Sequence, residues 1–437
     1  SIYKNVFKLD PSTILEVDEN LKISKYKYYD LKKQLFNKSR NNRNLKVNKD
    51  TIDDVNKLLQ LKMKNMLSKD FKVGCFLSGG IDSALITSLA QSLSKKKIET
   101  YTLKTSLKNF DESISAKKIS QYLGTNHNTY NVKKKDVISY VNNMHNYYSE
   151  PFGDSSQIPS FLLSRYAKKK IKIVLTGDGG DEISGGYNRY LYFKQYHKIF
   201  NKNIFFKTLL KLSIPIFDKI NRAINVNLFN IWNLSSKLRK LKYMINIESF
   251  SEYYDMSISQ GHYDAKYLKS SSQIDNKKYL NKNGYTFKDL MYLDLKLYFP
   301  DDILCKMDRA AMYNSIENRT LFANHKIIEH FFKLPSNFLI NRFKTKFILK
   351  KLLGYYLPQD YISNIKKGFS IPMSFYLKHY LSKWGDEVLD VKNLSKHDLF
   401  NNDYLILKWI NFKKDKNDNN YHQLWNILVL QNWINKH

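Results

Sequence analysis

Cysteine is scarce in this chain of 437 residues, which contains only Cys75 and Cys305. Two isolated cysteines exclude a disulfide framework and a Cys-x-x-Cys metal or redox pair. The His-x-x-x-His and Cys/His spacings of zinc sites are missing too, so we interpret His127 and His325 as locally packed or hydrogen-bonded histidines. Cys75 lies in an apolar stretch and is expected to be a small buried side chain.

Long hydrophobic runs are also missing. No stretch approaches the roughly 18 apolar residues that cross a bilayer. The N-terminus lacks the charged-then-apolar pattern of a signal peptide. We therefore expect a cytoplasmic protein without a membrane partner. A hydrophobic fraction of 43% over 437 residues predicts a globular protein with a sizeable core and more than one structural unit.

Acidic residues are few relative to basic ones, with 40 Asp and Glu against 72 Lys and Arg, and the net charge is +32. The lysines are spread along the chain in short runs such as 95–97, 133–135 and 168–170. This distribution favours a solvated surface over a specific nucleic-acid site. The remaining consequence is a long-range field that attracts anionic substrates.

The strongest motif is SGGIDS at residues 78–83, within FKVGCFLSGGIDSAL (71–85). An apolar run, two glycines and a helical pattern predict a buried strand, a tight turn and a helix N-terminus that favours an anion. Asp82 supplies a carboxylate for a phosphate-bound magnesium ion. No Walker pattern occurs. The loop instead matches enzymes that split ATP between its α and β phosphates, the alternative being a purely structural turn.

Strand and helix patterns alternate after this loop. Strands are predicted at 98–105, 127–132 and 171–175, and helices at 112–123, 136–148 and 160–169. This rhythm predicts an α/β fold with a doubly wound parallel sheet, followed by a mostly helical lobe. We expect three parts, namely residues 1–50 as a connector region, 51–190 as the α/β core, and 191–437 as the helical lobe that completes the site.

A second glycine-rich loop, TGDGGDEISGG (176–186), follows the strand that ends at Leu175. It contains three carboxylates, Asp178, Asp181 and Glu182. A surface turn would tolerate this composition, but clustered carboxylates beyond a buried strand are costly without a cation. Ligands of such sheets bind at the carboxyl ends of the strands. We therefore expect Asp82 and Asp181 to hold magnesium on a pyrophosphate group.

Several motifs occur together in a recognisable order. They are SGGIDSALI (78–86), FDES (110–113), EPFGDSSQIP (150–159), LTGDGGDEISGGYNRY (175–190), DRAAMYNSIENRTLF (308–322) and KKGFSIP (366–372). From about residue 50 to the C-terminus the chain resembles the synthetase domain of glutamine-hydrolysing asparagine synthetases, in the ATP-pyrophosphatase superfamily. The resemblance implies a five-stranded sheet of the adenine nucleotide alpha-hydrolase type.

The resemblance also implies a two-step reaction. The β-carboxylate of aspartate attacks the α-phosphate of ATP, β-aspartyl-AMP forms, and pyrophosphate leaves. Ammonia then attacks the acyl carbon and gives asparagine and AMP. ATP is the substrate and Mg²⁺ the cofactor. A related amidotransferase acting on a sugar acid, a peptide or a secondary metabolite is the alternative, and a tRNA-modifying thiolase is disfavoured by the isolated cysteines.

The resemblance assigns residues of this chain to the nucleotide. Leu77 and Leu103 would contact the adenosine part, and Thr176 and Gly177 would line the nucleotide. The residues that would hold the pyrophosphate and its magnesium are Ser78, Gly79, Gly80, Asp82 and Ser83, with Asp181 as the second magnesium ligand.

Two further residues are implied to take part in the chemistry. Asp178 stands where many relatives have Glu, at a position tied to formation of the acyl-adenylate. Lys366, with Lys367 as the alternative, would stabilise negative charge during adenylation or amide formation. Asp301 and Asp302 fall near a region that shapes the acceptor site in relatives, although a helix N-cap explains them equally well.

The first 50 residues resemble the end of the family's glutaminase domain and a linker. KLDPSTILEV (8–17) is similar to a K-L-x-P-G stretch that precedes the synthetase domain, with Ser12 where Gly is usual. Residue 1 is Ser and no cysteine precedes Cys75, so the catalytic cysteine of a glutaminase is missing. Nitrogen would then come from ammonia or from a glutaminase domain that was truncated or lies on another chain. A homodimer is a further expected assembly.

Overall fold

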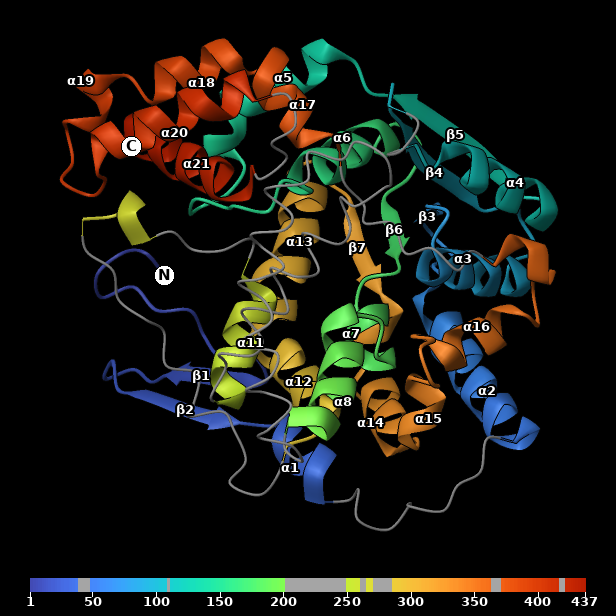
Figure 1. Ribbon diagram of the computed structural model, residues 1–437. Helices are drawn as coiled ribbons and strands as arrows, with labels where there is room; N and C mark the ends of the chain where they lie inside the picture. The colour runs from blue at the N-terminus through green and yellow to red at the C-terminus, as the bar shows by residue number, and fades with distance from the viewer. Residues whose placement is uncertain are drawn as a thin grey trace.

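The structure, a computed structural model, describes residues 1–37, 48–107, 111–200, 249–259, 265–269, 285–362, 371–415 and 421–437, with the backbone alone at 195–200. Its centre is a five-stranded sheet in the order β5-β4-β3-β6-β7 (Figure 1). The strands are β3 (Val73–Phe76), β4 (Glu99–Lys104), β5 (Asn126–Asn131), β6 (Ile173–Thr176) and β7 (Glu317–Thr320). All neighbouring strands are parallel, which confirms the predicted sheet.

Alternate residues of the central strands enter two different hydrophobic clusters. Cys75 and Leu175 belong to a cluster with α2 (Lys49–Met66), α3 (Ile81–Leu93), α4 (Ser113–Leu123) and α16 (Phe347–Leu353). Val174 belongs to another, formed with α6 (Gln157–Ala167) and α13 (Cys305–Met312). The sheet is therefore covered on both faces, as the near-continuous apolar runs of buried parallel strands require.

The strand β7 was not predicted. The sequence predicts a mostly helical lobe after residue 190, yet ENRT pairs in register with β6 from Ile173↔Glu317 to Thr176↔Thr320. This segment is polar and lies at the edge of the sheet, so it shows no apolar alternation. Pairing with β6, which is a tertiary contact, makes it a strand.

The remaining described helices surround this core. They are α1 (Leu31–Asn37), α5 (Lys134–Asn143), α7 (Gly180–Ser184), α8 (Asn188–Phe200), α11 (Phe250–Ile258), α12 (Phe287–Leu293), α14 (His325–Lys333), α15 (Ser336–Leu339), α17 (Met373–His379), α18 (Ser382–Val388), α19 (Val391–Leu394), α20 (Asn402–Lys414) and α21 (His422–Lys436). Short 3₁₀ turns occur at η3 (Met144–Asn146), η4 (Ala265–Tyr267), η7 (Leu321–Ala323) and η8 (Gln359–Tyr361).

A π-helix, η6 (Asp294–Leu304), joins α12 to α13 and contains Pro300. π-helical turns are rare and frequently occur at functional sites. Here the wide turn brings Tyr298 and Ile303 to the wall of the cavity described below. Asp301 and Asp302 lie inside η6, so the N-cap explanation for them is wrong.

Helices α5 and α17–α21 form a lobe with a hydrophobic cluster of its own, which also takes in Ile158 and Phe161 of α6. The cluster around α3 in turn contains residues on both sides of position 190, from Leu35 to Ile362. This cluster crosses the predicted boundary at residue 190, and the division of the chain there stays a prediction. Among the described residues, none of the helices combines the length and apolar character needed to cross a bilayer.

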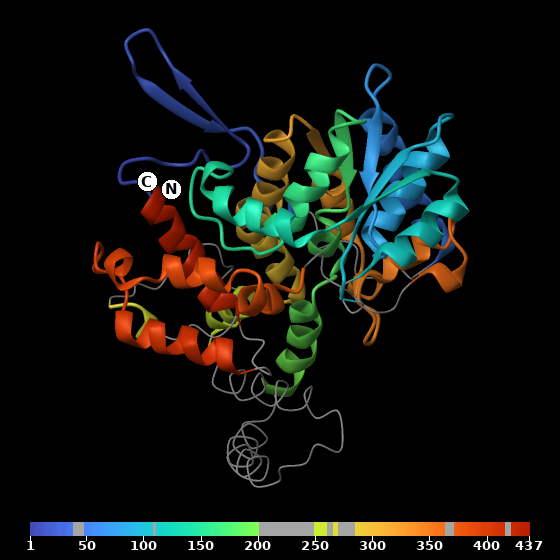
Figure 2. The same cartoon turned by 90° about the horizontal axis from the view of Figure 1, so that it is seen from above.

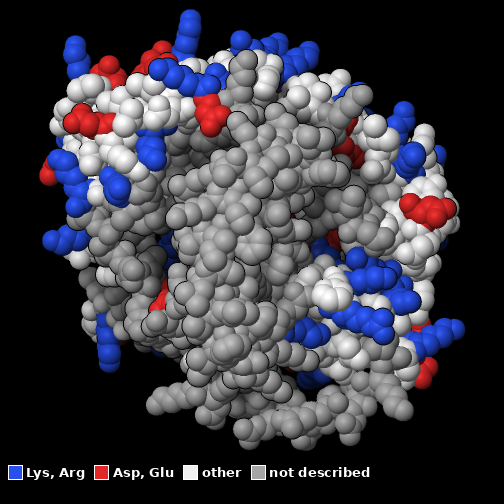
Figure 3. Space-filling view, viewed as in Figure 1, with Lys and Arg blue, Asp and Glu red and all other residues white. Residues whose placement is uncertain are grey.

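An antiparallel hairpin, β1 (Thr13–Val17) and β2 (Ile23–Lys27), projects from the body of the molecule (Figures 1 and 2). Ser12 precedes β1 with a φ of 61°, in the left-handed region where glycine is most easily accommodated. This is the position at which the sequence resemblance expects glycine. On the described part of the surface in Figure 3, Lys and Arg are scattered around the rim rather than gathered in one stripe.

Candidate active site

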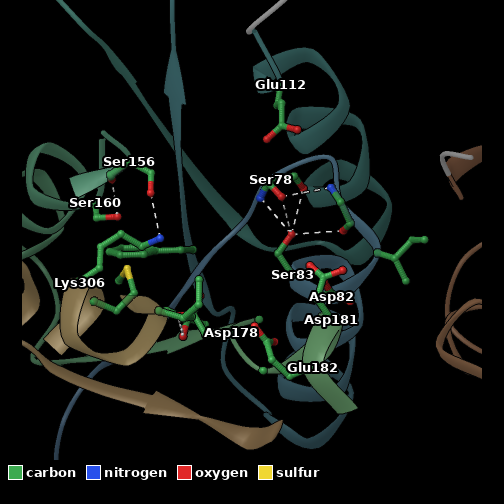
Figure 4. Close-up of a pocket in the computed structure, with 18 of the residues that line it drawn as sticks. Ser78, Asp82, Ser83, Glu112, Ser156, Ser160, Asp178, Asp181, Glu182 and Lys306 are labelled. Carbon is green, nitrogen blue, oxygen red and sulfur yellow. Dashed lines mark hydrogen bonds between the residues drawn. The ribbon is translucent and has the colours of Figure 1, made fainter. Parts of the chain in front are cut away.

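A cavity of about 660 Å³ lies at the carboxyl ends of β3 and β6. The two glycine-rich loops form one wall, and η6, α13 and the start of α21 form the opposite end. Figure 4 shows Ser78, Ser83, Asp82 and Asp181 on one side, with Lys306, Ser156 and Ser160 across from them. Because strands of a parallel sheet end at the same edge, loops that are about 100 residues apart in sequence meet here.

The first loop is held together by its own hydroxyl groups. Ser83 Oγ lies 2.9 Å from Ser78 Oγ and accepts a hydrogen bond from Ser78 N (3.1 Å). Gly80 N donates to Ser78 Oγ (3.1 Å). Gly80 is also the N-cap residue of α3 and makes no side-chain cap bond. N–H groups in the first turn of this 13-residue helix therefore remain for an anionic ligand.

Glycines of the second loop allow it to approach the first. A Cβ at Gly177 would lie 2.8 Å from Ser83 N, and a Cβ at Gly180 would lie 2.6 Å from Asp82 Cγ. Real Cβ atoms do not come this close to other heavy atoms. The spacing of glycines in TGDGGDE is therefore a condition for bringing Asp82 and Asp181 together.

Asp82 and Asp181 share one ammonium group. Lys346 Nζ forms an ion pair with Asp82 and lies 2.9 Å from Asp181 Oδ1. Burial alone would lower the pKa of Lys346, but the two carboxylates outweigh it and hold the pKa above its usual value. Lys346 was not predicted, because one lysine among 72 basic residues carries no signal in the sequence.

These carboxylates also fit a magnesium ion. They converge on a single positive charge, and Mg²⁺ takes one or two carboxylates together with phosphate oxygens. Within the part of the chain that the structure describes, no group of three or more His, Cys, Asp or Glu could hold a metal ion by itself. Asp82 and Asp181 would therefore supply only part of a ligand set, which phosphate oxygens would complete.

Asp178 is half-buried in the loop that follows β6, next to the end of β7. Thr176 Oγ1 lies 2.7 Å from Asp178 Oδ2 and 3.1 Å from Asn318 Oδ1 of β7. Burial raises the pKa of Asp178, while Lys306 acts in the opposite direction. The unpredicted strand β7 thus supports the loop that carries this carboxylate.

The far end of the cavity contains a second lysine, Lys306, beside Asp154, and Asp302 stands near this pair without lining the cavity. Lys306 Nζ donates to Asp154 Oδ2 (2.9 Å) and to Ser156 Oγ (2.8 Å). Burial would raise the pKa of Asp154, but Lys306 lowers it to about 2. Burial and the neighbouring Asp154 raise the pKa of Asp302 to about 7. Asp154 is therefore firmly ionised, whereas Asp302 is only partly ionised near neutral pH.

Most of the residues predicted for the site line this single cavity. They are Leu77, Ser78, Gly79, Gly80, Asp82, Ser83, Thr176, Gly177, Asp178 and Asp181. Leu103 is buried in the cluster with Tyr101 and is not among the residues that line it. Lys366 and Lys367 lie outside the described residues. The roles assigned to all of these residues stay predictions.

The two histidines that were set aside behave as expected. His127 Nδ1 lies 3.0 Å from Thr100 Oγ1, and the ring of His325 packs edge-on against Tyr29 at 5.5 Å. Neither lines the cavity.

Comparison with known proteins gives consistent results. A family model described as asparagine synthase matches residues 54–435. Asparagine synthetase [glutamine-hydrolyzing] 1 of Bacillus subtilis is 25% identical over 388 residues, 84% of this chain and 56% of that protein. The putative asparagine synthetase [glutamine-hydrolyzing] 2 of Methanocaldococcus jannaschii is 29% identical over 321 residues, 71% of this chain and 58% of that protein.

The matched part of each curated relative is thus little more than half of its length. Among solved structures, the NH3-dependent NAD synthetase of Campylobacter jejuni aligns with 46% of this chain and 97% of its own. The identity is 17% and the TM-score 0.23.

Proposed function

The chain belongs to the asparagine synthase family, and we propose that it is an ATP-dependent ligase that makes asparagine from aspartate. The main observation behind the proposal is that Asp82 and Asp181, which come from two separate glycine-rich loops, form a common binding position for a positive charge, which the ammonium group of Lys346 occupies. Such a binding position at the carboxyl ends of parallel strands suits a pyrophosphate leaving group.

The first loop would bind the β and γ phosphates of ATP. Hydrogen bonds among Ser78, Gly80 and Ser83 hold the loop in place, and N–H groups at the start of α3 favour the anion. Lys346 adds a buried positive charge at the same point. Magnesium bound by Asp82 and Asp181 would supply further neutralisation of the pyrophosphate.

The acceptor would lie towards Lys306, across the cavity from the phosphates. The β-carboxylate of aspartate attacks the α-phosphorus, the bond to the β-phosphate oxygen breaks, and pyrophosphate leaves with the electron pair. Ammonia then displaces AMP from the acyl carbon and loses a proton to give the amide. Lys306 offers a hydrogen-bond donor to a charged acceptor, and Asp154 and Ser156 hold Lys306 in position.

The source of nitrogen belongs to the proposal as well. We infer that ammonia enters as the free molecule or from a glutaminase domain, because the chain matches relatives named glutamine-hydrolyzing over little more than half of their length. The remaining predicted residues, Asp178 and Lys366, would act on the acyl-adenylate side of the reaction. A different small carboxylate is the second candidate acceptor.

Pyrophosphate release from ATP tests this function. The purified chain is assayed with magnesium, aspartate and ammonia, and each component is left out in turn. We expect release that requires aspartate, with asparagine and AMP as the other products. Asp82→Asn should lower the rate at least about 100-fold, because charge stabilisation of this kind contributes factors of about 10²–10³.

Asp70→Asn is the matched control, because Asp70 is an exposed carboxylate just before β3 and outside the cavity. It should retain the wild-type rate. Pyrophosphate release that continues without aspartate would contradict the proposed reaction. So would the absence of pyrophosphate release when all components are present. Release that requires a different carboxylate would select the second candidate acceptor.

A further inference from the structure

Lys346 occupies the binding position that the proposed function gives to a metal ion. Its Nζ is paired with Asp82 and lies 2.9 Å from Asp181 Oδ1, so a single ammonium sits against both predicted metal ligands. One positive charge therefore already faces two carboxylates. A divalent ion placed between the same oxygens would meet a like charge in direct contact.

The backbone holds Lys346 in this position. It follows a tight turn in which Asn341 N donates to Lys344 O (3.0 Å) and Lys344 N donates to Asn341 O (2.8 Å). Its φ of 53° lies in the left-handed region, which a non-glycine residue adopts only when its surroundings require it. A Cβ at Gly186 would overlap both Asp181 Oδ1 and Lys346 Cε. The side chain is therefore built into the site and is not a surface lysine that folded inward.

We propose that Lys346 is a resident cation that a divalent metal must displace, so that metal enters this site together with a polyphosphate and not alone. The inference rests on the proposed function, because it takes Asp82 and Asp181 as the metal ligands.

A bound polyphosphate would remove the repulsion between the metal ion and the ammonium group of Lys346, because it supplies negative charge to both. Lys346, Lys350 and Ser78 all line the same cavity, so phosphate oxygens bound at the first loop lie within reach of the Lys346 side chain. The ammonium can then exchange its carboxylate partners for phosphate oxygens while the metal takes over the carboxylates. By linkage, polyphosphate raises the affinity for metal by the same factor by which metal raises the affinity for polyphosphate.

Manganese binding measures this exchange without turnover. Bare Mn²⁺ is titrated into the full chain without nucleotide, and the free ion is followed by electron paramagnetic resonance. The preformed manganese–pyrophosphate complex is then titrated by calorimetry. Lys346→Gln should bind bare Mn²⁺ at least tenfold more tightly than wild type and the complex at least tenfold more weakly. Because bare Mn²⁺ is a cation and its pyrophosphate complex is an anion, loss of any nearby positive charge shifts the two affinities in opposite directions, so the size of the shift must be compared with that of a second lysine outside the cavity.

Lys346→Met is the second variant, so that the test does not depend on one folded substitution. Lys351→Gln is the control, because Lys351 is an exposed lysine of α16, the helix that Lys346 precedes as N-cap residue, and it does not line the cavity. It should change both affinities less than twofold. Unchanged or weaker binding of bare Mn²⁺ by the Lys346 variants, or equal tightening by Lys351→Gln, would overturn the inference. Failure of the proposed metal site is separate, since Asp82→Asn would then leave binding of the complex unchanged.

Discussion

Each end of the cavity contains a buried lysine that interacts with two carboxylates, one of which, Asp302, does not line the cavity, and the two clusters differ in how the charges are shared. Lys346 bridges Asp82 and Asp181, which come from two separate loops. Lys306 instead binds Asp154 and the hydroxyl of Ser156, while Asp302 stands beside this pair with its pKa raised to about 7. Lys346 thus forms ion pairs with two carboxylates, whereas Lys306 forms an ion pair with one.

This difference separates an exchangeable charge from a fixed one. The two carboxylates that bind the ammonium of Lys346 could bind another cation in its place. A lysine whose hydrogen bonds go to one ionised carboxylate and one hydroxyl has its donors satisfied in place, and the neighbouring Asp302, with its raised pKa, is only partly ionised near neutral pH. We therefore assign cation binding to the first cluster and structural support of the acceptor end to the second.

The largest expected effect comes from removing the fixed charge. Lys306→Met would leave Asp154 buried without its cation, and breaking such a pair costs about 3–5 kcal/mol. The free energy of unfolding, measured by urea denaturation at pH 7, should fall by that amount. The double variant Lys306→Met/Asp154→Asn should recover part of the loss. Additive losses in the double variant would show that the two residues do not form a coupled pair.

A smaller effect is expected from a substitution that crowds the cation-binding position at Asp82 and Asp181. Gly186→Ala places a Cβ against Asp181 and Lys346, so both groups must shift. We expect the KM for ATP to rise about tenfold, which corresponds to roughly 1.4 kcal/mol, with little change in the urea midpoint. Gly354→Ala is the control, since its nearest contact would be 3.3 Å from Lys351 O, away from the cavity. An unchanged KM in Gly186→Ala would remove the steric argument for this loop.

The smallest expected effect, taken per unit of pH, is a pH dependence of stability from Asp302. Its pKa is raised from 3.8 to about 7, so the folded chain retains a proton that the unfolded chain has lost. Stability should therefore fall as pH rises from about 4 to 7. Between pH 5 and 6 this group contributes about 1 kcal/mol of that loss. Asp302→Asn should flatten this part of the profile, and an unaltered slope would place the titration on another group.

The core of the fold could be predicted because its signals are local. The apolar runs that became β3 and β6, and the helical periods of α3, α4 and α6, are visible in windows of about ten residues. The polar edge strand β7 has no such signal. Leu103 shows a different limit, because a motif places a residue at the end of a strand but does not say which face of the sheet receives its side chain.

The residues of the candidate site also fall into those that the sequence could predict and those that it could not. Asp82, Asp178 and Asp181 stand in glycine-rich loops directly after buried strands, a pattern that sequence alone connects with phosphate and metal chemistry. Lys346 follows an ordinary basic segment, and Lys306 and Asp154 are separated by about 150 residues. Nothing near these residues in the sequence distinguishes them from other charged residues.

The sequence by itself therefore determined the parallel sheet, the two loops and the class of chemistry, since each depends on residues that are neighbours along the chain. Only the tertiary structure decided which lysine lies between Asp82 and Asp181, and which acid beside Lys306 has its pKa raised. The physical reason is that electrostatic interactions depend on distance and burial. Those quantities exist only once segments such as 78–83, 176–186 and 341–346 have been brought together in space.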